Sequence, residues 1–310
     1  MESPERKPVF NVQQSLENIA TVSDVEKVEL DEEYFTWAKE HFSKEDYKRI
    51  EENYASIDAY KYKYLSDDLN IAGYLWVPKE IKEKLPVIVW NRGGSSEIGS
   101  TGQKIGNAYI DIPCELVKNG AIVVGSEYRG AIGSEGKDEW GGNDLNDVVR
   151  VKEIADQLPM SKPGKSVVVG RSRGGMMSYL LAAREPWVKA IVSLAGTTDI
   201  AQSAEERPEM REIFTKAFGG GEEEMKKRSA TEFYKEIPKD IPLLIMHTED
   251  DTRVSVDQAR KLVGLLESNG NHVEYHEFKE GGHSFNNPKS PHAKEISEIM
   301  NRFLKEQLKA

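Results

Sequence analysis

The chain of 310 residues has a single cysteine, Cys114. A disulfide within the chain is therefore impossible, and the default expectation is a reducing, cytoplasmic setting. No apolar run approaches the roughly 20 residues that a membrane-spanning helix needs, so we expect no membrane partner. Residues 1–7 lead into no apolar core, so we expect no secretion signal, although a chain whose leader had been removed would look the same.

Positively charged residues are also fewer than negatively charged ones. The 42 Lys and Arg residues against 53 Asp and Glu residues give a formal net charge of −11 at pH 7. Such a chain repels phosphate backbones, so we expect no nucleic-acid partner. The tripeptide Gly164-Lys165-Ser166 resembles the end of a phosphate-binding loop, but it precedes a predicted strand instead of following one. No cluster has the spacing of zinc ligands, so we expect neither a metal nor another cofactor.

Short apolar runs alternate with helical stretches through most of the chain. A hairpin is predicted at a sheet edge from residues 57–64 and 71–77, with its turn at Asp67 and Asp68. Six further strands are predicted at residues 87–90, 121–124, 167–169, 191–194, 243–246 and 273–276. Continuous apolar strands joined by helices indicate an α/β fold, with a mostly parallel central sheet that is covered by helices on both faces.

The pattern divides the chain into two parts. Residues 1–55 are polar and predict a short helical N-terminal extension, or a partly mobile tail before about Leu30. Residues 56–310 form the predicted α/β domain. Within it, residues 197–240 are too long for an ordinary connection and predict two helices, 204–218 and 222–234. This insertion is either a lid over the functional site or an ordinary surface pair of helices.

The segment Gly170-Arg171-Ser172-Arg173-Gly174 is the most informative motif. It follows a predicted buried strand and precedes a predicted helix, which is the layout of the nucleophile elbow in serine hydrolases. Glycines on either side of the serine allow a strained turn to close without side-chain clashes. The serine hydroxyl would then lie near a helix N-terminus, where developing negative charge is favoured.

A nucleophilic serine needs a base and a group that orients the base. Among the six histidines, His283 lies in a glycine-rich loop after the last predicted strand, whereas His247 ends a buried run and is expected to be a packed core residue. The acid should follow the strand at 243–246. Three carboxylates stand in a row there, Glu249, Asp250 and Asp251, and local spacing alone does not select one of them.

An oxyanion also needs backbone N–H donors aimed at it. One is expected from Arg173, the residue after the nucleophile. The second is expected from the loop after the strand at 87–90, at Arg92 or Gly93, because the paired glycines there let the backbone approach a substrate closely. Cys114 is expected to be a buried structural residue and not a nucleophile.

With these segments in place, the chain resembles the α/β-hydrolase superfamily and, more narrowly, the catalytic domain of the prolyl oligopeptidase (S9) peptidases and related esterases. The resemblance covers residues from about 57 to the C-terminus, and its motifs are 170–175, 228–230, 242–247, 250–254 and 281–283. It implies an α/β-hydrolase fold with Asp251 as the acid of the triad and Asp250 as the fallback. It also implies that Tyr128-Arg129-Gly130 lies near the site.

Two departures from the family pattern bear on specificity. The family's oxyanion loop usually reads His-Gly-Gly, and Arg92-Gly93-Gly94 takes its place here. Arg92 and Arg173 would add positive charge near the pocket and favour an acidic substrate, unless they pair with Glu127 or other acids. The roughly 56 residues before the domain are too few for the family's β-propeller, so oligopeptidase specificity is not carried over.

These observations predict a serine hydrolase that uses Ser172, His283 and Asp251. It would cleave amide bonds of short peptides, or esters, through an acyl-enzyme. The alternatives are a carboxylesterase for small esters and a catalytically inactive binding protein on the same fold. The expected partner is a small ester or short peptide, and the sequence does not indicate an oligomeric state.

Overall fold

A computed structural model of the chain describes residues 10–95, 108–109, 112–285 and 290–309, and the N-terminal residues 1–7 considered above lie outside them. Its strands are β1 (Val22–Lys27), β2 (Ile57–Ser66), β3 (Leu69–Pro78), β4 (Val87–Asn91), β5 (Ile122–Ser126), β6 (Ser166–Arg171), β7 (Val188–Leu194), β8 (Leu243–Thr248) and β9 (Val273–Phe278). They form one sheet in the order β1-β2-β3-β5-β4-β6-β7-β8-β9. The pairs from β5 to β9 are parallel and the others antiparallel, which confirms the predicted fold class.

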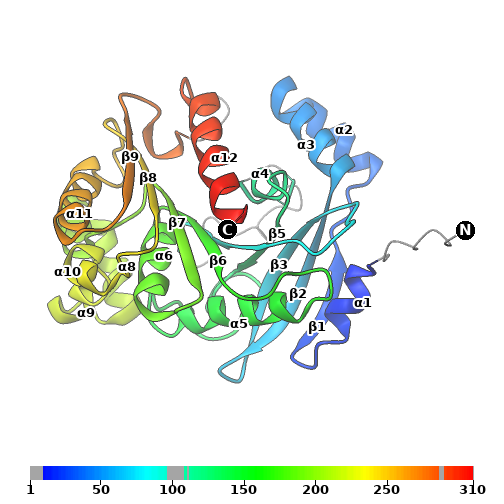
Figure 1. Cartoon of the computed structure of the whole chain (residues 1–310), viewed down its shortest axis with the longest axis horizontal. Coiled ribbons are helices and arrows are strands. Elements are labelled where there is room, and N and C mark those ends of the chain that lie inside the picture. The colour runs from blue at the N-terminus through cyan, green and yellow to red at the C-terminus, as the bar shows by residue number, and fades with distance from the viewer. Residues whose placement is uncertain (1–9, 96–107, 110–111, 286–289, 310) are drawn as a thin grey trace, which may run out of the picture.

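Helices cover both faces of this sheet (Figure 1). One face carries α1 (Val12–Glu17), α5 (Asp144–Gln157), α6 (Arg173–Arg184) and α11 (Val256–Asn269), and the other carries α2 (Glu32–His41), α3 (Lys44–Ser56), α4 (Ile112–Val117) and α12 (Ala293–Lys309). In β6, Val168 packs into one hydrophobic cluster while Val167 and Val169 pack into the other. Alternate side chains of a strand point to opposite faces, so a strand buried on both faces reads as a continuous apolar run. No helix in the described ranges is long and apolar enough to cross a membrane.

The predicted hairpin forms, but not at the sheet edge. Asp67 and Asp68 make its two-residue turn with φ of 48° and 64°, the left-handed backbone that such turns require. Strand β1 pairs with the outer side of β2, so the N-terminal segment is not only helical. Its sequence, Val-Ser-Asp-Val-Glu-Lys, has just two apolar residues and is only partly buried, as suits an exposed edge. Because of that polarity, the sequence does not predict a strand there.

The long connection between β7 and β8 consists of short helices. They are α7 (Ile200–Glu206), α8 (Pro208–Phe218), α9 (Glu222–Lys226), α10 (Ala230–Phe233) and the 3-10 turn η3 (Tyr234–Glu236). The first predicted helix is broken at Arg207, because proline disfavours helical backbone in the residue before it. Gly219 ends α8 in the left-handed conformation, with φ of 87°. These helices lie at the β9 end of the sheet, beside α11 (Figure 1).

Candidate active site

Ser172 occupies the turn between β6 and α6. Its φ of 57° and ψ of −123° are rare for a residue with a side chain, and such backbone costs on the order of 1–3 kcal/mol. A Cβ atom on Gly170 would lie 2.0 Å from the carbonyl oxygen of Gly174, and one on Gly174 would lie 1.9 Å from that of Asn91. Both positions therefore exclude any side chain, and the turn has the strand–serine–helix geometry that the motif predicts.

His283 and Asp251 are hydrogen-bonded to each other, with 2.8 Å between the histidine Nδ1 and the aspartate Oδ2. Asp251 follows β8, and His283 lies in the 3-10 turn η4 (Gly282–Ser284) after β9. Ser172 and His283 line the same cavity of about 360 Å³. In the described part of the chain, no hydrogen bond joins the serine hydroxyl to the imidazole. Such contacts are often loose in free enzymes and tighten when substrate binds.

Asp251 is the centre of a larger set of hydrogen bonds. Its Oδ1 accepts the backbone N–H groups of Arg253 and Val254, at 2.8 and 3.0 Å. Its Oδ2 lies 3.2 Å from Nε2 of His247 in addition to the contact with His283. Burial favours the neutral acid, but the hydrogen bonds from the two histidines outweigh it and hold the pKa of Asp251 below its usual value. The carboxylate therefore stays ionised throughout the neutral range.

His247 does more than fill the core. Its side chain is fully buried, as expected for a packed residue, and its Nε2 also lies 2.9 Å from the carbonyl oxygen of Val254. An Nε2–H group therefore faces both that oxygen and Asp251. The sequence analysis does not predict this contact. The position of His247 at the end of the strand that precedes the acid loop could have indicated it.

Asp250 has a separate task. Its carboxylate accepts the backbone N–H groups of Gly281 and Gly282, at 3.1 and 2.8 Å, and so fastens the loop that carries His283. Of the three consecutive carboxylates in the acid loop, Asp251 is the one bonded to His283.

The loop after β4 lies directly against the serine. A Cβ atom on Gly93 would come within 3.2 Å of the Cβ of Ser172, and Gly94 has a φ of 77° that favours glycine. Both glycines line the cavity with Ser172. Arg173 is the first residue of α6, so its N–H has no partner within the helix. The N–H groups of Gly93 and Arg173 make no hydrogen bond within the described residues.

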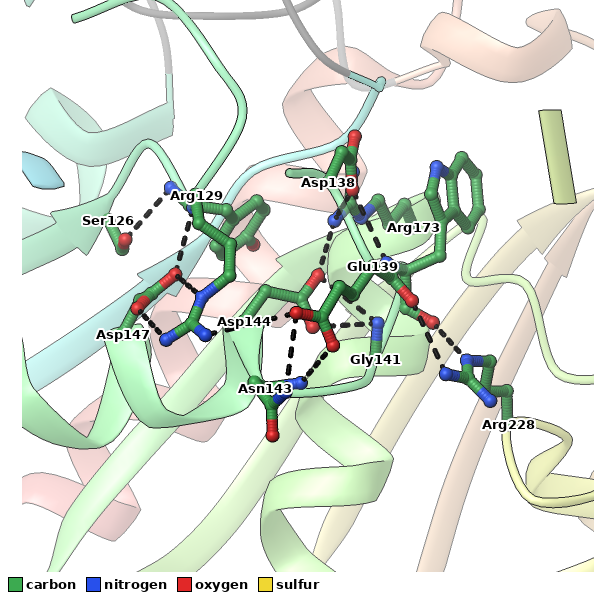
Figure 2. A network of polar contacts seen from close by, with 12 residues as sticks. Ser126, Arg129, Asp138, Glu139, Gly141, Asn143, Asp144, Asp147, Arg173 and Arg228 are labelled. Carbon is green, nitrogen blue, oxygen red and sulfur yellow. Dashed lines mark hydrogen bonds and ion pairs between the residues drawn. The ribbon is translucent and has the colours of Figure 1, made fainter. Parts of the chain in front are cut away.

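The structure corrects the idea that Arg92 and Arg173 present charge to a substrate. Nε of Arg92 lies 2.9 Å from Glu127, and the guanidinium of Arg173 lies 2.6 Å from both Asp138 and Asp144. Both arginine side chains are buried, and neither residue lines the described cavity wall. Figure 2 shows Arg173 enclosed by its two carboxylate partners. Their positive charges are paired with carboxylates inside the protein, which is the alternative that the sequence also allows.

Other residues determine the character of the cavity. Part of its wall is apolar, with Trp140 and, from α8, Met210 and Ile213. The described wall also holds the charged residues Arg171, Arg207, Glu209 and Arg253. Several of these come from the insertion between β7 and β8, which thus forms one side of the site. No three His, Cys, Asp or Glu side chains in the described ranges are grouped to hold a metal ion.

Comparisons with known proteins agree with this architecture. Residues 114–310 match the prolyl oligopeptidase family. Over 205 residues the chain is 28% identical to the uncharacterized peptidase YtmA of Bacillus subtilis, covering 63% of this chain and 74% of that protein. The fold of this chain is similar to that of an acylaminoacyl peptidase of Pyrococcus horikoshii, with a TM-score of 0.70 and 22% identity, over 82% of this chain but only 42% of the other. An esterase of Pyrococcus furiosus gives a TM-score of 0.61 and 16% identity over 80% and 90% of the two chains.

Proposed function

The chain belongs to the prolyl oligopeptidase family, and from this membership we propose that it is a serine hydrolase acting on short peptides or esters through an acyl-enzyme. One observation carries the proposal. A serine at a strained strand–helix turn and a histidine hydrogen-bonded to a buried aspartate line one cavity. That arrangement supplies a nucleophile, a base and a group that orients the base.

In the proposed reaction, Ser172 Oγ attacks the substrate carbonyl carbon while Nε2 of His283 takes the hydroxyl proton. Asp251 accepts the Nδ1–H of the imidazole, which leaves Nε2 as the acceptor. The N–H groups of Arg173 and Gly93 hydrogen-bond the oxyanion. When the tetrahedral intermediate collapses, His283 gives its proton to the departing amine or alcohol. Water then attacks the acyl-enzyme with the same base and releases the acid.

The size and walls of the cavity favour small substrates. A volume of about 360 Å³ lies at the lower end of the range for small-molecule sites. Met210 and Ile213 of the insertion face this space, so we propose that residues 197–240 act as a lid that limits the length of the acyl group. The leaving group, an amine or an alcohol, decides between a peptidase and an esterase.

A substrate panel tests this function. Steady-state hydrolysis is measured for p-nitrophenyl esters of increasing acyl length and for aminoacyl and dipeptidyl anilides, with the wild type and Ser172→Ala. We expect hydrolysis of at least one class, and its loss in the variant with an unchanged melting temperature. Faster cleavage of esters than of anilides would favour the carboxylesterase. A folded wild type that cleaves neither class would favour the inactive binding protein.

A further inference from the structure

Three successive backbone carbonyls beside the serine are each held by a buried side chain. The carbonyl oxygen of Arg92 accepts the hydroxyl of Tyr128 at 3.2 Å, and that of Gly93 accepts an N–H of the Arg92 guanidinium at 2.9 Å. The carbonyl oxygen of Gly94 accepts an N–H of the Arg173 guanidinium at 3.2 Å. All three carbonyls therefore face donors from the protein interior.

This pattern fixes where the intervening N–H groups point. A trans peptide is planar, so each N–H points opposite to the carbonyl of the same peptide unit, and the described chain has no cis peptide bond. The N–H groups of Gly93, Gly94 and Ser95 therefore point away from the interior donors. These three residues line the cavity that contains Ser172, and their N–H groups make no hydrogen bond within the described residues.

The donor from Arg173 is itself held firmly. Asp138 receives two of its N–H groups at 2.6 and 2.8 Å, and Asp144 receives another at 2.6 Å. The guanidinium carbon lies 4.9 Å from the ring centre of Tyr128 and 4.8 Å from that of Trp140. Figure 2 shows this arginine with both carboxylates aimed at it. A fully buried, neutralised and ring-packed guanidinium has little freedom, so it provides a rigid anchor for the Gly94 carbonyl.

We propose that Arg173 is a positioning residue that sets the oxyanion hole through its side chain. Its guanidinium holds the Gly94 carbonyl and, together with Tyr128 on the Arg92 carbonyl, fixes the 92–95 loop so that the loop's N–H groups face the cavity. Its own backbone N–H stands at the start of α6 beside Ser172. Arg173 thus contributes to both parts of the oxyanion hole, to the loop through its side chain and to the helix start through its backbone N–H. The inference rests on the proposed hydrolase function and adds the device that aims its donors.

If Arg173 had a purely structural role, its replacement would affect kcat no more than the replacement of another buried, ion-paired arginine. Arg129 provides this matched control. The Arg129 side chain is also buried, and its guanidinium lies 2.7 Å from Asp147 and 2.8 Å from Asp67 within the same network. It makes no hydrogen bond to the 92–95 loop within the described residues. Replacing either arginine by lysine disturbs a buried ion pair, but only one of the two replacements disturbs the loop.

The experiment compares Arg173→Lys, Tyr128→Phe and Arg129→Lys with the wild type. It measures kcat and KM on a p-nitrophenyl ester, the rate of phosphonylation by a fluorophosphonate, and the melting temperature. Since misplaced oxyanion donors cost on the order of 10–100-fold in rate, we expect Arg173→Lys to lower kcat and the phosphonylation rate by about that factor. KM should change by less than about threefold, because the donors act mainly in the transition state.

Tyr128→Phe removes one hydroxyl but keeps the ring against both guanidinium groups, so it should fold normally and lower kcat by roughly 3–10-fold. It decides the question if Arg173→Lys does not fold. Arg129→Lys should lower the melting temperature while leaving kcat within about threefold.

Equal kcat losses in the two lysine variants, or an unchanged kcat in Tyr128→Phe, would overturn the inference while the hydrolase function stands. A wild type that neither hydrolyses substrate nor reacts with the fluorophosphonate would overturn the proposed function, and the inference with it.

Discussion

Replacing Asp251 by asparagine tests the orientation of the histidine with one changed atom. The two backbone N–H groups at Oδ1 would hold the amide oxygen of the new side chain in that position. Its NH₂ group would then occupy the place of Oδ2, where Nδ1 of His283 now donates. Two donors cannot face each other, so the imidazole would move its proton to Nε2. The nitrogen facing Ser172 would then be unable to accept the serine proton.

The expected loss is large because the base is disabled while the fold is kept. The equivalent change in a serine protease lowers kcat about 10⁴-fold, which corresponds to roughly 5.5 kcal/mol of transition-state stabilisation. We expect a loss of that order in Asp251→Asn, measured as kcat on a p-nitrophenyl ester at saturating concentration. The melting temperature should fall modestly, because the Nε2–H of His247, which now faces Oδ2 of Asp251, would face the new NH₂ group instead.

The neighbouring carboxylate supplies the control. The N–H groups of Gly281 and Gly282 bond to different oxygens of Asp250, so Asp250→Asn keeps an acceptor for one of the two, and kcat should remain within about tenfold of the wild type. Retention of more than about a tenth of wild-type kcat in Asp251→Asn, or a larger loss in Asp250→Asn, would contradict this role of Asp251.

The packing around Gly174, the side chain of Ile213 in the cavity wall and the charge of Asp251 can each be tested by one substitution. Gly174→Ala places a Cβ atom 1.9 Å from the carbonyl oxygen of Asn91, so it should lower the melting temperature by more than about 5 °C or prevent soluble expression; a fully stable variant would contradict the geometry. Ile213→Ala shortens a side chain that faces the cavity and limits acyl length, so kcat/KM for octanoyl esters should rise about 5–20-fold with acetyl esters unaffected, and an equal effect on both would remove Ile213 from the acyl site. The pKa of Asp251 is lower in the folded chain than its unfolded value of about 3.9, so its charge stabilises the fold above that pH and this contribution is lost as the pH falls. Urea titrations should therefore show that the difference in unfolding free energy between wild type and Asp251→Asn shrinks from about pH 5 to pH 2. A constant difference would contradict the lowered pKa.

The parts of the fold that could be predicted from the sequence are those with a local physical cause. The five strands β4 to β8 could be predicted because burial on both faces demands apolar residues throughout, as in the 167–169 run of β6. The turn at Ser172 could be predicted because positions 170 and 174 have no space for a side chain, so both must be glycine. By contrast, β1 is a polar edge strand whose pairing with β2 leaves little trace in its own sequence.

The site shows the same boundary between local and long-range causes. His283 and the acid loop could be placed by their positions after strands, but Asp250 and Asp251 are locally equivalent and only the geometry of the folded chain separates them. The role of Arg173 depends on Asp138 and Asp144, which lie 29–35 residues earlier in the chain and meet it only through the sheet topology. No spacing rule reveals such partners, so the sequence alone allows both a substrate-facing arginine and a paired one.

The proposed mechanism depends on Ser172 as the nucleophile. The most direct measurement is the intact mass of the protein after reaction with a fluorophosphonate, followed by peptide mapping of the adduct. We predict a single adduct on the peptide that contains Ser172, absent from Ser172→Ala and retained in Cys114→Ala, whose thiol is buried. A folded wild type without an adduct, or an adduct on any other residue, would contradict the account.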